Sequence, residues 1–460
     1  RSFAPELAGS YDSGAGNGIF GMGWDIGIAS ISRKTQKGLP RYLDSEDSDE
    51  FLLSGAEDLV PALQKIQTGD GIAWKLDETP NVSPETRIDA TVLTQQEQRD
   101  AFLSSFPNGG GGNYIVRRYR PRTEGLFARI ERWQHQETGD IHWRVTTPDN
   151  VTNVYGKDDN SRIVDPTVDP ADSSRIFEWL LCESYDDKGH VIAYHYKVED
   201  GKQVDRAVPQ ERNRYTEKKP TYTNRYLKRV LYGNQKPYQR SEQAEEWLFQ
   251  VVFDYGEHGQ WNEKKEEIGP STPVENFGWH HRPDSFSSYR AGFEVRTQRL
   301  CRRVLMFHRF DDQGAIAQPG SGSKLWYLVS SINFKYERNP VATYLTAVTQ
   351  TGYRWNFGAN RYDSKSYPPV EFTYDKPELH HEIQVVDPKS LENLPVGLDN
   401  AAYQFLDLDG EGISGILTQQ GGGWFYKANK GSGEFEPLRS VSKQPALVGG
   451  SSSQQRFLDL

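Results

Sequence analysis

Short runs that alternate apolar and polar residues, together with runs that are almost wholly apolar or aromatic, recur along most of the chain. Runs of this length bounded by turn-forming residues are typical of β-strands. Two pairs of runs are separated by tight turns and predict β-hairpins: 141–146 with 151–156, and 176–181 with 191–196. The pattern therefore predicts antiparallel β-structure.

Five further strands are predicted downstream, and several are long enough to build wide sheets. They lie at 226–232, 247–255, 293–310, 325–336 and 343–350. The best helical pattern is short: Thr94 and Glu97 form a capping box ahead of an apolar run at 101–103. The glycine-rich segment 108–113 is typical of a flexible connector, and it leads into a strand at 114–116.

The segment 11–25 contains five glycines and leads into an alternating run at 26–33, which predicts a half-buried strand. Residues 16–21 fit the G-x-G-x-x-G pattern of dinucleotide-binding loops. That pattern binds a pyrophosphate only between a buried strand and the N-terminus of a helix. Here a strand pattern follows instead, so the glycines predict a tight connection between strands.

Composition removes one doubt about this interpretation. A mean hydropathy of −0.76 and a hydrophobic fraction of 35% would be compatible with disorder. The 24 Tyr, 21 Phe and 11 Trp indicate a packed core instead, and the 42 Gly and 25 Pro indicate many turns. We therefore expect an all-β shell or sandwich.

Charge and cysteine content exclude several classes of protein. A net charge of −10 does not favour nucleic acid as a partner. The only cysteines, Cys182 and Cys301, are too few for a disulfide framework or a thiolate metal cluster. No apolar run approaches the roughly 20 residues of a membrane-spanning helix, and no secretory leader pattern is present. Because the chain begins at Arg1 and stops within a strand pattern at Leu460, we expect it to be part of a longer protein.

Two acidic clusters are candidate cation sites. The segment 44–50 holds five carboxylates in seven positions, but it lacks ligand spacing and a bracing glycine, so we expect a solvated loop. Asp407 and Asp409 alternate in a glycine-rich turn and could offer oxygen ligands to calcium, although Gly415 occupies the place of a further acid. A turn capped by its own side chains is the preferred interpretation, and calcium stays open.

The other candidates for chemistry form no complete catalytic set. His280-His281, His380-His381 and His308 lack metal-binding spacing, and we expect partly exposed structural histidines. Serine chemistry lacks a G-x-S-x-G motif, since 320–323 is a Gly-Ser linker. Glu434-Phe435-Glu436 matches the E-x-E of ADP-ribosyltransferases but has no accompanying Ser-Thr-Ser strand. We predict no catalytic, cofactor-binding or metal residues, and no enzyme activity.

The segment 206–240 is the most basic part of the chain, with ten Lys/Arg against two acids and five interleaved tyrosines. Basic and aromatic side chains together are typical of single-stranded nucleic acid sites. In an acidic protein, however, such a segment is more typical of a solvated loop or an interface for an acidic partner. We expect no nucleic acid partner.

The glycine-rich opening, with 39–42 and 49–52 after it, closely resembles the opening of the SpvB-like family, which includes the B component of insecticidal Tc toxins. The blocks 247–257 and 292–308 are similar to the family in the same order, and the similarity extends over about residues 2–375. The resemblance implies extended antiparallel sheets that form part of a hollow shell, or cocoon. In these toxins the shell includes a C component, encloses its toxic C-terminal region, and docks on the translocation channel of an A component.

The last 60 residues differ in character. Residues 405–417 predict a strand, a tight turn and a second strand, and 424–426 predicts a third. The Phe-Leu-Asp-Leu run at 405–408 recurs 52 residues later at 457–460, close to the ~40–50-residue period of propeller blades. The turn also resembles FG-GAP/VCBS propeller repeats, and we expect Gly410 or Gly412 to adopt positive φ there.

The chain therefore divides into a shell region at 1–375, a linker at 376–400, and a first β-propeller repeat with the truncated start of the next at 401–460. The resemblance implies a non-catalytic structural subunit of a secreted Tc toxin, with the C and A components as partners and no direct membrane insertion. Two alternatives stay open. One is the N-terminal region of a secreted SpvB-type ADP-ribosyltransferase effector, and the other is a cell-surface or carbohydrate-binding β scaffold.

Overall fold

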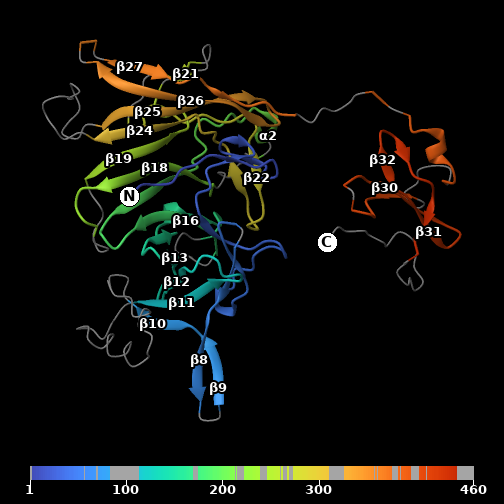
Figure 1. The fold of residues 1–460 in the computed structure, drawn as a ribbon, viewed down its shortest axis with the longest axis horizontal. Coiled ribbons are helices and arrows are strands. Elements are labelled where there is room, and N and C mark those ends of the chain that lie inside the picture. The colour runs from blue at the N-terminus through green and yellow to red at the C-terminus, as the bar shows by residue number, and fades with distance from the viewer. Residues whose placement is uncertain are drawn as a thin grey trace. The chain divides into compact units, whose positions relative to one another are not determined.

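The computed structural model describes residues 3–442, apart from 56, 69–70, 83–112, 169–174, 213, 215–221, 239–245, 260, 263–266, 269–272, 310–325, 357, 360, 376–381, 384, 395–402 and 411. It divides into two compact units, 1–374 and 375–460, both built mainly from antiparallel strands (Figure 1). Several predictions fall outside the described residues: the helix at 94–103, the connector 108–112, the linker 320–323, His380-His381 and the repeat at 457–460.

Eight described strands of the first unit close into an antiparallel barrel. In order around it they are β5 (Ser30–Arg33), β6 (Phe51–Leu53), β7 (Glu57–Pro61), β11 (Tyr114–Pro121), β12 (Arg129–His135), β13 (Ile141–Thr146), β14 (Thr152–Tyr155) and β16 (Ile176–Tyr185), which pairs back with β5. Closure removes open edges from this part of the sheet. It depends on pairs remote in sequence, such as Ser32 with Glu178, and the strand pattern did not predict it.

The barrel interior is filled by aromatic side chains from four of its strands. Phe51, Tyr119, Trp143 and Trp179 pack with ring centroids 4.9–6.0 Å apart, all in edge-to-face geometry. This arrangement sets the positive edge of one ring against the negative face of another. Both tryptophans are completely buried. The packed core that the aromatic content indicated is therefore present.

Beyond the barrel, the sheet continues from β16 as an open antiparallel meander (Figure 1). Its strands are β17 (Val191–Val198), β18 (Arg225–Asn234), β19 (Trp247–Asp254), β24 (Arg303–Arg309), β25 (Trp326–Arg338) and β26 (Thr343–Asn356), and β26 pairs with both β27 (Arg361–Ser366) and β28 (Val370–Glu371). Both predicted hairpins are confirmed. So are four of the five further strands, as β18, β19, β25 and β26.

The single strand predicted at 293–310 is wrong. The chain forms β23 (Val295–Thr297), leaves strand geometry over 298–302, and resumes as β24. The backbone of that gap bonds elsewhere: the amide of Gln298 donates to the hydroxyl of Tyr226, and the amide of Arg302 donates to the carbonyl of Asp254. These contacts with remote residues satisfy backbone amides that would otherwise have bonded to a neighbouring strand.

Smaller elements complete the first unit. They are β1 (Ser10–Tyr11) with β4 (Trp24–Asp25), β2 (Asn17–Gly18) with β3 (Gly21–Met22), β8 (Leu63–Thr68) with β9 (Gly71–Leu76), β20 (Trp261–Asn262) with β21 (Glu267–Ile268), β22 (Phe286–Ser288) with β23, β10 (Glu78–Val82) on β11, and β15 (Arg162–Val164) on β16. The helical turns are η1 (Asp44–Glu46), η3 (Asp159–Ser161) and α2 (Pro209–Arg212). Within the described ranges, the helices are too short and too polar to cross a bilayer.

The second unit contains a four-stranded antiparallel sheet in the order β29 (Tyr403–Leu406), β30 (Gly415–Gln420), β31 (Gly423–Lys427) and β34 (Arg439–Ser440). Beside it lie η5 (Pro388–Leu391) and the pair β32 (Asn429–Gly431) and β33 (Glu434–Phe435). The predicted strand–turn–strand is confirmed, and both Gly410 (φ +74°) and Gly412 (φ +82°) adopt the expected positive φ.

Candidate functional site: a clasped apolar pocket and a buried ion network

The glycine-rich segment folds as a small hairpin. β2 pairs with β3, so the predicted tight connection between strands is confirmed. Gly21 has a φ of +88°, and a β-carbon there would lie 2.7 Å from the carbonyl oxygen of Thr343. Only glycine tolerates both this dihedral and this approach. Because strands follow the G-x-G-x-x-G pattern, the structure lacks the helix N-terminus that a pyrophosphate cradle requires at this place.

A buried arginine clamps this hairpin to the body of the unit. Arg282 donates from Nη1 to the carbonyl of Gly18 and from Nη2 to Oδ1 of Asn17, both at 2.8 Å. Asp284 binds the same guanidinium at 2.9 Å and accepts a hydrogen bond from Asn17 Nδ2 at 2.8 Å. Burial alone would raise the pKa of Asp284, but the hydrogen bond and charge of Arg282 lower it. The clamp is therefore charged on both sides.

A second set of contacts holds the end of the glycine-rich segment. The indole Nε1 of Trp24 donates to the hydroxyl of Tyr374 at 2.8 Å, and that hydroxyl donates to the carbonyl of Leu345 at 2.6 Å. The ring of Trp24 also packs on Phe372, with centroids 4.7 Å apart. The N-terminal segment is thus latched to β26 and to the residues after β28.

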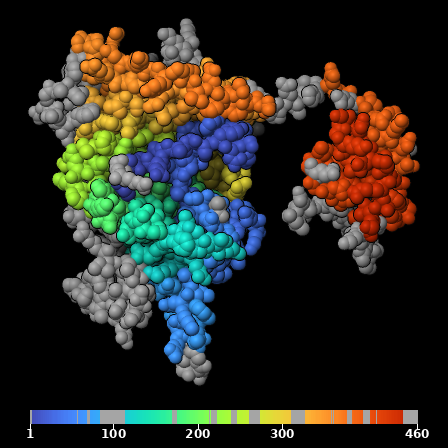
Figure 2. All heavy atoms as spheres, in the orientation of Figure 1, coloured from blue at the N-terminus to red at the C-terminus, as the bar shows by residue number. Residues whose placement is uncertain are grey.

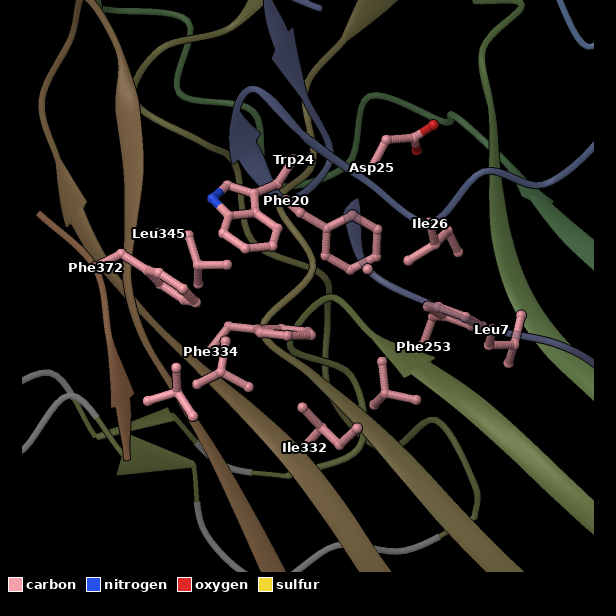
Figure 3. Close-up of a pocket in the computed structure, with 14 residues that line it drawn as sticks. Leu7, Phe20, Trp24, Asp25, Ile26, Phe253, Ile332, Phe334, Leu345 and Phe372 are labelled. Atoms are coloured by element: carbon pink, nitrogen blue, oxygen red, sulfur yellow. The ribbon is translucent and has the colours of Figure 1, made fainter. Parts of the chain in front are cut away.

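Next to the latch lies an apolar pocket of about 310 Å³, which Trp24, Leu345 and Phe372 help to line (Figure 3). Its wall is formed by aliphatic and aromatic side chains, among them Phe20, Trp24, Phe253, Phe334, Leu345 and Phe372. Asp25 is the only charged residue among those lining it. The pocket therefore offers an apolar surface but no pair of groups suited to acid–base or nucleophilic chemistry.

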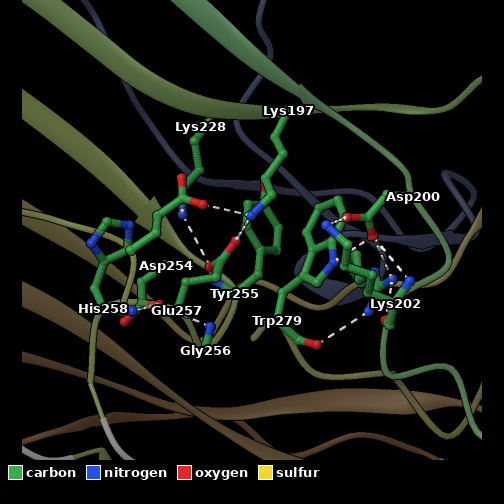
Figure 4. Close-up of polar contacts among 12 residues, drawn as sticks. Lys197, Asp200, Lys202, Lys228, Asp254, Tyr255, Gly256, Glu257, His258 and Trp279 are labelled. Atoms are coloured by element: carbon green, nitrogen blue, oxygen red, sulfur yellow. Dashed lines mark hydrogen bonds and ion pairs between the residues drawn. The ribbon is translucent and has the colours of Figure 1, made fainter. Parts of the chain in front are cut away.

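A network of buried charges is centred on Glu257 (Figure 4). Its carboxylate accepts hydrogen bonds from Lys197 at 2.9 Å, from Lys228 at 3.0 Å and from the backbone amide of Tyr255 at 3.0 Å. Glu275 binds Lys197 at 2.7 Å. The buried Glu257 and Lys228 are thus paired, as buried charges require, and the more exposed Lys197 and Glu275 extend the network towards the surface.

The two lysines differ in their protonation behaviour. Burial alone would lower the pKa of Lys197, but the charge and hydrogen bond of Glu257 outweigh it and raise the pKa. Lys228 is more deeply buried, and there burial dominates and lowers the pKa. A lysine of lowered pKa is a possible nucleophile. Lys228, however, also donates to the carbonyl of Phe253 at 3.1 Å and is almost inaccessible to solvent, so its position is that of a structural cation.

A second buried pair adjoins the network through Trp279. Arg299 donates to Glu199 from Nε at 2.9 Å, and its guanidinium lies 4.1 Å from the ring centre of Trp279. The Nζ of Lys197 lies 4.4 Å from the same ring, and the indole donates to Asp200 at 3.0 Å. Two cations therefore share one aromatic ring, which is favourable because its electron-rich faces attract positive charge.

The acidic segment 44–50 differs in part from its prediction. Glu46, Asp47 and Glu50 are exposed, as expected of a solvated loop, but Arg33, whose side chain is fully buried, binds Asp44 at 2.8 Å and Asp49 at 2.7 Å. Asp49 also accepts the backbone amides of Arg41 and Tyr42. Burial would raise its pKa, whereas these amides and Arg33 lower it. The basic partner, Arg33, lies in β5. The sequence of the acidic segment itself gives no sign of this pairing.

Asp407 and Asp409 form the side-chain-capped turn that was preferred. Asp407 accepts the backbone amides of Gly410 at 2.9 Å and of Gly412 at 2.5 Å. Asp409 forms an ion pair with Arg439 at 2.5 Å. No cluster of three metal-ligating side chains occurs within the described residues. In the same unit, Glu434 of the E-x-E motif begins the short strand β33.

Of the histidines singled out in the sequence, His280, His281 and His308 are described, and all three are partly exposed, as predicted. His281 shares a hydrogen bond with Ser285 at 2.8 Å, and His308 packs its ring on Phe249 at 4.9 Å. Burial lowers the pKa of His280, His281 and His308 alike. In the described part of the basic segment, Tyr226 is buried in the core, so it is unavailable for stacking on a base.

Sequence reasoning missed the buried network, including Glu199, Glu257, Arg282 and Arg299. One signal could have pointed to it. The block 292–308 carries arginines within an otherwise apolar stretch, and a basic residue in a core strand requires a buried acid.

The closed barrel, the wide open sheet and the four-stranded sheet that follows define an all-β fold that also occurs in solved structures of Tc toxins. The fold matches the crystal structure of TcdB2-TccC3 over 97% of this chain and 19% of that chain, with a TM-score of 0.72 and 29% identity. It also matches a Tc holotoxin pore structure from Photorhabdus luminescens over 97% of this chain and 18% of that chain, with a TM-score of 0.69 and 28% identity.

The chain belongs to the SpvB family, whose model, described as Salmonella virulence plasmid 65kDa B protein, matches residues 1–310. It is 36% identical over 359 residues to the mono(ADP-ribosyl)transferase SpvB of Salmonella typhimurium, which covers 77% of this chain and 52% of the relative. The chain thus spans about half the length of the curated relatives it matches. The N-terminal domain of effector protein SpvB from Salmonella typhimurium matches 77% of this chain and 96% of that domain, with a TM-score of 0.60 and 34% identity. The sequence-based resemblance is confirmed.

Proposed function

We propose that this chain is a non-catalytic structural segment of a secreted Tc toxin B component. Its first unit forms part of the shell that, with a C component, encloses a cytotoxic enzyme. Its second unit begins a β-propeller that docks on the translocation channel of an A component. The proposal keeps the division into a shell region at 1–375, a linker at 376–400 and a propeller repeat from 401.

The observation that carries the proposal is the difference in coverage between the two kinds of relative. The solved SpvB domain accounts for 77% of the chain, whereas TcdB2-TccC3 accounts for 97%. The additional fifth corresponds in length to the second unit. A segment shared with the toxin structures but not with the effector domain favours the toxin assignment.

The architecture of the second unit supports the propeller part of the proposal. Its sheet is a four-stranded antiparallel meander, and it buries side chains on both faces. Successive residues of a strand point to opposite faces, and Ile416, Leu417 and Thr418 are all at most 5% exposed. Propeller blades are four-stranded sheets packed between neighbours on both faces. A sheet with only one buried face would be expected at a surface.

The effector alternative rests on the 36% identity to SpvB. In that case these residues form the non-catalytic N-terminal region, and a transferase domain follows. Both alternatives give the first unit a structural role, and they differ in what the second unit does.

The decisive experiment compares two buried tyrosines in the complete B–C assembly. Tyr426, in β31, is 1% exposed, and its hydroxyl donates to the carbonyl of Leu406 at 3.2 Å. Tyr255, in the first unit, is 0% exposed, and its hydroxyl donates to the carbonyl of Leu227 at 3.0 Å. Truncation to alanine removes a comparable buried ring from each unit, at a cost of about 3–5 kcal/mol.

We expect Tyr426→Ala to impair binding to the A component while the cargo stays protected from protease. We expect Tyr255→Ala to impair cargo protection first. If Tyr426→Ala instead exposes the cargo and binding to A survives, the second unit belongs to the shell and the propeller assignment is wrong.

A further inference from the structure

The hairpin formed by β8 and β9 projects from the first unit as a narrow finger (Figures 1 and 2). Its base is fixed to the barrel, because Ala62 donates its amide to the carbonyl of Arg118 and accepts the amide of Asp77, both at 2.9 Å. Within the described residues, β8 and β9 pair only with each other. An isolated two-stranded hairpin is at best marginally stable in water. We therefore asked whether the surface of the finger is suited to further contacts.

One face of the finger is mainly apolar: four of its six residues are apolar, and the other two are Lys65 and Gln67. Directly opposed residues of an antiparallel pair share a face, and the register opposes Leu63 to Leu76, Lys65 to Trp74 and Gln67 to Ile72. The apolar residues on this face are largely uncovered: Leu63 is 52%, Ile72 61% and Trp74 65% exposed. We call Leu63, Ile72, Trp74 and Leu76 the finger face.

The opposite face has a different character. It carries Gln64 opposite Lys75, and Ile66 opposite Ala73. An exposed tryptophan flanked by two aliphatic residues is the composition of an interface rather than of a free surface. The asymmetry shows which side of the finger would meet a partner.

The small area of the finger face limits what that partner can be. Six residues of strand span about 20 Å, and two strands are about 10 Å wide, which gives roughly 200 Å² on each side. A stable interface between free proteins needs about 800 Å² per partner. The finger face therefore cannot hold a freely diffusing partner or a second copy of the chain by itself. Its partner must already be held nearby by other contacts.

We propose that the finger face docks on an apolar face of the toxin shell's own β-sheet, contributed by shell residues outside this chain. The inference rests on the proposed function. A closed shell supplies a neighbour that is already held in place. In the TcdB2-TccC3 structure, the matched residues make up 19% of that chain, so most of such a shell lies outside the present residues.

The native cysteines make a sharp labelling test possible. Cys182 and Cys301 are buried, and burial raises the pKa of the Cys182 thiol to about 12 and that of Cys301 as well. Neither is a reactive thiolate at neutral pH. A single cysteine placed on the finger would therefore be the fast-reacting site of this chain.

The experiment compares Trp74→Cys, on the finger face, with the matched control Lys75→Cys, on the opposite face one residue away. Each variant is introduced into the complete B–C assembly and labelled with a maleimide, and its rate is compared with the rate in urea. We expect position 74 to be labelled at least about tenfold more slowly than position 75 in the native assembly, since access controls thiol reactivity. Ile72→Cys, on the finger face, repeats the comparison with a smaller loss of apolar surface.

Equal rates at 74 and 75 would overturn the proposal, and so would equal protection of both positions. Loss of assembly in Trp74→Cys but not in Lys75→Cys would support it. Protease resistance of the enclosed cargo is measured in parallel. If the assembly protects its cargo while positions 74 and 75 react at equal rates, the finger contact is refuted but the proposed function is not. A wild-type assembly that leaves its cargo unprotected refutes the proposed function.

Discussion

Arg299 and Glu199 are 100 positions apart in sequence, yet they form a two-pronged ion pair in the interior of the first unit. Neither side chain is more than 1% exposed. The attraction between buried charges offsets their desolvation only when both partners are present and well oriented. The pair therefore specifies how the gap between β23 and β24 meets the end of β17, and removing one partner leaves an uncompensated charge.

Glu199→Gln should destabilise the protein strongly because it leaves Arg299 buried without its counter-ion. We expect a loss of about 3–5 kcal/mol in the free energy of unfolding, as is typical when one partner of a buried pair is removed. Urea unfolding followed by tryptophan fluorescence would measure it.

The matched control for this change is Asp363→Asn, which removes a surface ion pair. Arg361 and Asp363 are 4.0 Å apart with side chains 75% and 54% exposed, and such pairs contribute at most about 0.5–1 kcal/mol. Equal effects at Glu199 and Asp363 would show that the buried pair does not constrain the fold.

Substitutions of two glycines in the N-terminal segment would distinguish the cost of backbone strain from the cost of a steric clash. Gly21 and Gly27 both have positive φ, but only at Gly21 would a β-carbon meet a neighbour. Gly27→Ala should cost about 1 kcal/mol through strain. Gly21→Ala should cost about 1–3 kcal/mol more, since the backbone at Thr343 must move. Thermal unfolding of the two variants would test the difference, and similar melting temperatures would contradict the close approach.

High pH should unfold the protein cooperatively. Burial raises the pKa of Tyr155, Tyr226, Tyr255 and Tyr336. A group whose pKa is raised on folding contributes stability that is complete below its unfolded pKa, about 10 for tyrosine, and that is lost as pH rises further. Tyrosinate absorbance should therefore increase together with the loss of circular dichroism. Ionisation of all tyrosines with the dichroism unchanged would show that these hydroxyls are accessible.

The 460 residues should transfer no ADP-ribose. The buried carboxylates and lysines described above are paired with one another, and the described pocket offers one charged residue, so this pocket presents no nucleophile–base pair. Incubation with NAD and actin, with a transferase-containing SpvB effector as positive control, would measure this. Consumption of NAD by this chain above the buffer rate would contradict the prediction.

Much of the fold was predictable because strand patterns and turns act locally. The hairpin of β13 and β14, the strands β18, β19, β25 and β26, and the capped turn at Asp407 follow from alternation and from the conformational freedom of Gly410 and Gly412. The family could be recognised from the order of its blocks for the same reason: each block is a contiguous run of residues.

The sequence by itself therefore determined the class of fold, most of the long strands of the sheet and the family. Only the tertiary structure decided that eight strands close into a barrel, that Arg33 binds Asp44 and Asp49 of the acidic segment, and that the strand predicted over 293–310 breaks where Arg299 meets Glu199. These features depend on which residues meet across long sequence separations. Local propensity carries no information about such pairs, because the cost of burying a charge is offset only by a partner that the fold brings to it.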